Sequence, residues 1–263
     1  MNQRLDRGLH AERAGSPLAP AILFIHPNPM DASCWTFQMA HLSIWFRTIA
    51  VDLPGYGLSP AWPGSFDLDD VAMACWAVLD EEGATPAAIV GCSVGAHVAM
   101  RMALGRPSGT RSLVLSGTGY HPSSQPKAFA ARRKAAFEVE GLGYRRSYLR
   151  ENFSASFRDT PVARWFEEQC VARGPGDLPT ILALFDATSA ADAEGFHDGL
   201  RMPVLVIGGS EDKSHQRAPG LVAQLPDAEA ITLPGAGHAC HVERPWEYDG
   251  HLLDFLERRV GVP

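Results

Sequence analysis

AIVGCSVGAH, residues 88–97, joins a buried apolar strand to the start of a helix through a turn with glycines two positions before and after Ser93. This G-x-S-x-G pattern is typical of a nucleophile elbow, a sharp and strained turn that lifts a serine oxygen out of a sheet. Gly91 and Gly95 fill positions that tolerate only small residues. Because chance produces such a pentapeptide in a chain of this length with odds on the order of one in ten, the serine needs chemical partners elsewhere in the chain.

The composition predicts an ordinary globular protein. The chain has 263 residues, of which 46% are hydrophobic and 20% charged, enough for one large α/β domain or two small ones without disulfides or a metal. The net charge of -7, with no basic stripe, argues against nucleic acid as a partner. Residues 1–20 lack the apolar core of a signal peptide and no later run is long enough for a membrane span, so we expect a cytoplasmic location and no membrane partner.

No cofactor or metal is predicted. The pair Gly55 and Gly57 lacks the third glycine of a dinucleotide fingerprint, and no C-x-x-C pair is present. Cys92 adjoins the elbow, where we expect a small buried residue rather than a second nucleophile. The five cysteines are expected to be reduced thiols, and they are Cys34, Cys75, Cys92, Cys170 and Cys240. No pattern in the chain predicts an oligomeric state.

Short apolar runs alternate with longer helical patterns, which predicts an α/β fold with a mostly parallel sheet flanked by helices. The expected strands are 21–25, 47–52, 87–91, 112–116, 203–207 and 230–233. The expected helices are 34–46, 69–82, the segment from the elbow to Arg106, and 245–259. Since parallel strands place their carboxyl ends at one edge, residues that follow these strands are candidates for a common site.

Between residues 119 and 200 the strand pattern disappears, and charged and aromatic residues recur at helical spacing. This stretch lies between two strands, so we interpret it as a helical cap over the carboxyl ends of the sheet. The predicted organisation is an α/β core made of residues 1–118 and 201–263, with residues 119–200 inserted as the cap.

A serine attacks a carbonyl at neutral pH only if a base takes its proton, and the base needs an acid to hold its tautomer. Asp212 follows the predicted strand 203–207 and is the expected acid, although its neighbour Glu211 could be mistaken for it. His238 follows two glycines after the strand 230–233 and is the expected base. His241, just ahead of the final helix, is the alternative, with a packing or capping role as the simpler reading.

The oxyanion of acyl transfer needs at least two fixed donors. One is the backbone N–H of Val94, at the positive end of the helix that follows the elbow. The other is expected in the loop after strand 21–25, where Pro27 and Pro29 have no N–H to offer. Asn28 is therefore the leading donor and Met30 the fallback, and either proline could follow a cis peptide bond.

With these residues assembled, the chain resembles the α/β-hydrolase superfamily over nearly its whole length. The matching segments are 26–30, 52–59, 91–95, 209–212 and 235–245. The resemblance implies a mostly parallel sheet of the eight-stranded type. It also implies a nucleophile at Ser93, a base at His238, an orienting acid at Asp212, and oxyanion donors at Asn28 and Val94.

The short form with a helical cap looks like the group that holds 3-oxoadipate enol-lactonases, haloperoxidase-like esterases and carbon-carbon bond hydrolases of aromatic catabolism. Pro27 departs from this group, which usually has glycine after the loop histidine. Ala239 stands where carbon-carbon hydrolases often carry tryptophan, which disfavours that activity. Ser93 argues against haloalkane dehalogenases and epoxide hydrolases, which use aspartate as the nucleophile.

The predicted function is hydrolysis of a small ester, lactone or amide through an acyl-serine intermediate, with a carboxylate-bearing catabolic intermediate as one substrate class. Arg132, Arg145 and Arg146 of the cap are the candidates to bind such a carboxylate. Trp35, with Trp62 and the aromatic residues of the cap, would form apolar walls; the alternative is that these aromatic residues form only the core of the cap itself. The alternatives are a carbon-carbon bond hydrolase of a ring-opened diketone acid and a ligand receptor that retains the triad.

Overall fold

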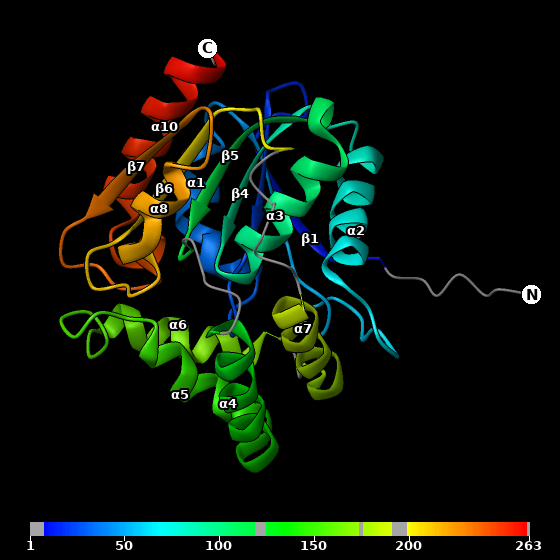
Figure 1. Cartoon of the computed structure of the whole chain (residues 1–263), viewed down its shortest axis with the longest axis vertical. Helices are drawn as coiled ribbons and strands as arrows, with labels where there is room; N and C mark the ends of the chain where they lie inside the picture. The colour runs from blue at the N-terminus through cyan, green and yellow to red at the C-terminus, as the bar shows by residue number, and fades with distance from the viewer. Residues whose placement is uncertain (1–7, 119–124, 174–175, 191–198, 262–263) are drawn as a thin grey trace, which may run out of the picture.

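A seven-stranded sheet forms the centre of the computed structural model, which describes residues 8–118, 125–173, 176–190 and 199–261. The strand order is β1-β3-β2-β4-β5-β6-β7, with β1 antiparallel to β3 and every other neighbouring pair parallel. The strands are β1 (Ala11–Ala14), β2 (Ala21–Ile25), β3 (Arg47–Val51), β4 (Ala87–Cys92), β5 (Thr110–Ser116), β6 (Val204–Gly209) and β7 (Ala228–Leu233). The parallel arrangement aligns the carboxyl ends of β2–β7 at one edge (Figure 1).

Helices cover both faces of this sheet (Figure 1). On β2, Leu23 and Ile25 belong to one buried cluster together with residues of α2 (Leu68–Glu81) and α3 (Val94–Gly105). The intervening Ile22 and Phe24 belong to a second cluster on the other face, with residues of α1 (Thr36–Leu42) and α10 (Pro245–Val260). Because both faces are buried, the central strands are apolar throughout rather than alternating, and their polar residues gather at the strand ends.

In the described part of the segment between β5 and β6, four α-helices gather below the carboxyl ends of the strands (Figure 1). They are α4 (Gln125–Glu140), α5 (Tyr144–Glu151), α6 (Pro161–Ala172) and α7 (Leu178–Ala190). This agrees with the helical character expected for residues 119–200, although 119–124 and 191–198 lie outside the described residues. We refer to α4–α7 as the cap helices.

Three details differ from the expectations. The described sheet has seven strands rather than eight. β1, a short edge strand, was not anticipated, and neither were the short helices α8 (Ala218–Val222) and α9 (Cys240–Glu243). The helix expected at 34–46 begins as a 3₁₀ turn, Ala32–Trp35, and continues as α1.

All five cysteines are free and buried. Over the described ranges, no helix is both long and apolar enough to cross a bilayer.

Candidate active site

Ser93 lies between β4 and α3 in a strained backbone conformation, with φ 55° and ψ -116°. Among the described residues it is the only one other than glycine with a positive φ. A Cβ on Gly91 would lie 2.2 Å from the carbonyl oxygen of Gly95, and a Cβ on Gly95 would lie 2.2 Å from that of Ile25. Both glycines are therefore required by close backbone approach, as the elbow motif predicts. Ser93 itself remains partly exposed to a pocket.

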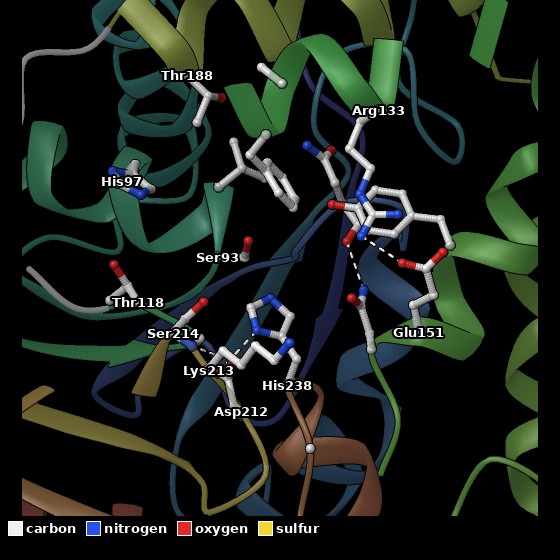
Figure 2. A pocket seen from close by; sticks show the side chains of 18 of the residues that line it. Ser93, His97, Thr118, Arg133, Glu151, Thr188, Asp212, Lys213, Ser214 and His238 are labelled. Atoms are coloured by element: carbon white, nitrogen blue, oxygen red, sulfur yellow. Dashed lines mark hydrogen bonds and ion pairs between the residues drawn. The ribbon is translucent and has the colours of Figure 1, made fainter. Parts of the chain in front are cut away.

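His238 and Asp212 form a hydrogen-bonded pair at the ends of β7 and β6. The His238 Nδ1 atom lies 3.0 Å from Asp212 Oδ2, and the other carboxylate oxygen accepts the Ser214 N–H at 2.8 Å (Figure 2). A carboxylate accepts only, so Nδ1 carries a proton, and in the neutral ring Nε2 is then unprotonated. This is the tautomer that a general base needs.

The backbone brings the His238 ring close to the elbow. Ser93 donates its N–H to the carbonyl of Ser116 at 2.9 Å. The next residue, Gly117, lies so close beneath the imidazole that a Cβ there would be 2.6 Å from Cε1 of His238. Behind the ring, the Cys92 thiol lies 3.9 Å from the carbonyl oxygen of His238. Ser93 and His238 therefore line the same pocket, with Asp212 on the far side of the ring (Figure 2).

Burial and charge act in opposite directions on this pair. Burial lowers the pKa of His238, but the charge and hydrogen bond of Asp212 outweigh it, so the pKa is raised above its ordinary 6.5. Burial also raises the pKa of Asp212, and the charge and hydrogen bond of His238 outweigh it in turn, so that pKa is lowered. Each partner thus favours the charged form of the other, and the carboxylate stabilises the imidazolium that forms when the base takes a proton.

Asn28 lies in a loop whose peptide planes are held by hydrogen bonds. The carbonyl of Pro27 accepts the Met30 N–H at 2.9 Å and faces Nδ1 of His26 at 3.0 Å. The Leu53 N–H donates to Nε2 of His26 at 2.8 Å, so His26 is neutral and its Nδ1–H donates to Pro27. Because the Pro27 carbonyl and the Asn28 N–H belong to one peptide unit, these bonds also set the direction of that N–H.

The two predicted oxyanion donors, Asn28 and Val94, both line the pocket with Ser93. Val94 is the first residue of α3, so its N–H has no acceptor within the helix. The fallback donor Met30 has its N–H engaged within the loop turn. Of the two loop prolines, Pro29 follows a cis peptide bond.

The pocket between the cap helices and the sheet has a volume of about 940 Å³, within the range of small-molecule sites. Its apolar walls include the cap residues Phe129, Tyr148, Phe153 and Phe185. Its charged lining is mainly basic, although the whole chain has a net charge of -7. Five side chains are basic (Arg132, Arg133, Arg158, Lys213 and Arg217) and three are acidic (Glu151, Glu211 and Asp212).

The structure separates the predicted substrate-binding residues. Arg132 lines the pocket. Arg145 does not: it is fully buried, and its Nε donates to the Pro29 carbonyl at 3.2 Å. Arg146 is exposed on α5 and also lies outside the pocket lining. Trp35 is buried away from the pocket, stacked on His241 at 4.1 Å between ring centroids, because its face of the 3₁₀ turn packs under α10.

The surroundings of His241 and Glu211 differ from those of the expected base His238 and the expected acid Asp212. His241 is fully buried, and burial lowers its pKa to about 3, so it is a neutral packing residue. Glu211 is exposed, and its carboxylate accepts the Ala155 N–H of the cap at 3.3 Å rather than facing His238. Burial raises the pKa of the Cys92 thiol well above its ordinary value, so this cysteine is no thiolate nucleophile.

Arg133 and Asn152 are among the residues of the pocket lining that the sequence analysis did not single out. Arg133 is one of several basic residues in α4, and only the helix orientation reveals that its side chain is buried against the pocket. Asn152 follows α5 and carried no motif. In the described part of the chain, no group of three or more metal-ligating side chains comes together.

Comparisons with known proteins agree with this architecture. Over 97% of its residues, the chain is 29% identical to the polyketide synthase ThaQ of Burkholderia thailandensis. The match covers 13% of ThaQ, so the chain spans about an eighth of that relative. It is 26% identical to "Putative carbamate hydrolase RutD" of Pseudomonas savastanoi pv. phaseolicola, over 99% of this chain and all of the relative.

Two solved structures show the same fold. A malate-bound thermophilic esterase from Thermogutta terrifontis matches with a TM-score of 0.84 and 23% identity, covering 95% of this chain and 93% of the other. The enol-lactonase from Burkholderia xenovorans LB400 matches with a TM-score of 0.83 and 22% identity, covering 94% and 96%. Residues 22–248 match the model of the alpha/beta hydrolase family, a span that includes the elbow and the segments that follow β6 and β7. The chain therefore belongs to the α/β hydrolase family.

Proposed function

We propose that the protein is a serine hydrolase that cleaves a small ester, lactone or amide through an acyl-serine intermediate. The observation that carries the proposal is the strained Ser93 at the floor of a pocket that also contains the hydrogen-bonded pair His238 and Asp212. Hydrolase names among the relatives, including a carbamate hydrolase and an esterase, support the same class of bond.

In the proposed mechanism, the Ser93 oxygen attacks the carbonyl carbon of the substrate while His238 Nε2 takes the serine proton. The carbonyl electrons move to oxygen, and the oxyanion accepts hydrogen bonds from the backbone N–H groups of Asn28 and Val94. Collapse breaks the bond to the leaving group, which takes the proton from His238. Water then attacks the acyl-serine in the same way and releases the acid.

A fluorophosphonate probe tests this proposal. The probe is expected to form one covalent adduct per chain, on Ser93, and to abolish turnover of 4-nitrophenyl butyrate in proportion to labelling. Mass spectrometry of the peptide that contains Gly91–Gly95 locates the adduct. If the protein turns over a ring-opened diketone acid but no ester or enol-lactone, the result supports carbon-carbon cleavage instead. Ligand-induced thermal stabilisation without turnover would support a receptor.

We also propose that the substrate carries a carboxylate, which Arg132 and Arg133 of α4 would bind. Arg133 is buried, with only 6% of its surface exposed, and its guanidinium lies 3.9 Å from the Tyr148 ring centroid. Glu151 accepts a hydrogen bond from it at 2.8 Å (Figure 2). Tyr144 accepts another at 2.5 Å, and the Nε atom is buried without a hydrogen-bond partner. Arg133 also acts on His238 through space, since its charge opposes the protonation of that ring.

Two matched esters test the carboxylate. 4-Nitrophenyl pentanoate and the 4-nitrophenyl half-ester of glutarate differ only in a terminal methyl or carboxylate group. At a pH above the acidic limb, where His238 is neutral in every variant, replacing Arg132 or Arg133 by methionine is expected to lower kcat/KM for the glutarate ester by about tenfold, the value of one charge-assisted hydrogen bond, and to spare the pentanoate ester. Arg164→Met, an exposed arginine of α6 outside the pocket, is the control. Equal losses on both esters would contradict the assignment.

A further inference from the structure

Helix α5 of the cap is hydrogen-bonded near both of its ends to the loop 26–30 that carries Asn28, which we call the oxyanion loop. At its start, the Arg145 Nε donates to the carbonyl of Pro29 at 3.2 Å. Just past its end, the side-chain amide of Asn152 donates through Nδ2 to the carbonyl of Asn28 at 3.2 Å. Two consecutive carbonyls of the loop thus accept hydrogen bonds from α5 and from the residue that follows it, 116 and 124 residues away in sequence.

Asn152 is also bonded to the loop that carries His238. Its own backbone carbonyl accepts the N–H of Ala239, the next residue after His238, at 3.1 Å. Two residues further along the cap, the Ser154 N–H donates to Glu243 Oε1 at 3.0 Å. The same oxygen accepts the Gly237 N–H, just before His238, at 3.1 Å. The cap segment after α5 therefore holds the histidine loop on both sides of the imidazole.

Among the residues that the structure describes, Asn152 is the one that hydrogen-bonds to both loops directly. Its side chain contacts the oxyanion loop, its backbone contacts the histidine loop, and it lines the pocket with only 7% of its surface exposed. The Asn28 N–H is fixed on its other side by the bonds to the Pro27 carbonyl. The contact from Asn152 adds to this support, because it holds the carbonyl of Asn28, the residue whose N–H is the proposed oxyanion donor.

We propose that Asn152 is a positioning residue that sets the Asn28 donor relative to the His238 base, so that the site is complete only when α5 is docked. The proposal rests on the proposed function. A displacement of a fixed donor or base on the order of 1 Å costs about 10²-fold in rate, whereas substrate binding through the apolar walls does not depend on it. Loss of the Asn152 donor should therefore appear in transition-state stabilisation and not in ground-state binding.

Two substitutions of nearly equal volume test this inference. Asn152→Leu and Asn152→Asp both remove the donor, and the aspartate keeps a polar side chain at the end of α5 if leucine prevents folding. Each is expected to lower kcat by about 10- to 100-fold and to leave KM within about threefold. Ser147→Ala, an exposed position on the same helix, is the control. Fluorophosphonate titration corrects every rate for the fraction of competent sites.

A transition-state analogue separates positioning from mere loss of folded protein. A trifluoromethyl ketone, which forms a tetrahedral adduct, is expected to bind more weakly by the same factor as kcat/KM falls, while the Ki of butyrate, the product, stays unchanged. The aspartate variant should also move the acidic limb of the pH profile upward, and the leucine variant should not. The inference is overturned if both variants keep kcat/KM within about twofold, or if the ketone binds as tightly as to the parent. Failure of the parent to be labelled or to turn over any ester would overturn the proposed function instead.

Discussion

Replacing Ser93 with alanine is expected to lower kcat for 4-nitrophenyl butyrate by roughly 10⁴- to 10⁶-fold and to abolish fluorophosphonate labelling. The reason is that no other side chain can supply the attacking oxygen at the end of β4, so the acyl-enzyme route is lost as a whole. Residual turnover would come from the oxyanion donors and from substrate positioning alone. Stopped assays at high enzyme concentration, with purity checked against contaminating esterases, measure the residual rate.

The fold should survive this change. Alanine keeps the Cβ of serine, so the strain at φ 55° is the same in both proteins and the thermal midpoint should be nearly unchanged. Cys92→Ala is the matched control, because it alters the adjacent residue, whose thiol is buried and protonated, and should retain most of the activity. If ester hydrolysis survives in Ser93→Ala but disappears in Cys92→Ala, Cys92 is the nucleophile and the proposed mechanism is refuted.

Those parts of the fold that depend on local pattern were predictable. The central strands have apolar runs because they are buried on both faces, so β2 and β4 were recognised within a residue of their bounds. β1 was not, because an edge strand of four residues buries only its first residue fully and carries no apolar run. The spacing of charged and aromatic residues predicted that the cap is helical, but it did not predict which face of each helix packs inward.

The residues of the candidate site also fall into those that the sequence predicts and those that it does not. Ser93, Asp212 and His238 follow strands whose carboxyl ends must meet, so topology alone brings them together. Arg145 illustrates the opposite case. It is a cap arginine like Arg132, but the structure directs it to the Pro29 carbonyl, a contact between segments more than a hundred residues apart that no local pattern encodes. Asn152 was missed for the same reason.

The second large effect is expected at the acid. Asp212→Asn should lower kcat by about 10³- to 10⁴-fold, since the neutral amide can donate to Nδ1 and stabilise the tautomer whose Nε2 is protonated and cannot act as a base. The same variant loses the negative charge that stabilises the imidazolium. Glu211→Gln, the neighbouring acid that faces the cap instead of His238, is the control and should retain most of the parent activity.

The pH profile gives this prediction a second, independent readout. His238 must be neutral to accept the serine proton, so kcat/KM of the parent should rise with pH through the raised pKa of His238, above 6.5. In Asp212→Asn, burial still lowers that pKa while the opposing charge is gone, so the acidic limb should move to lower pH even as the maximal rate falls. A rate loss with an unmoved limb would mean that Asp212 orients the ring without setting its charge. An unmoved rate would remove Asp212 from the mechanism altogether and leave His238 without its acid.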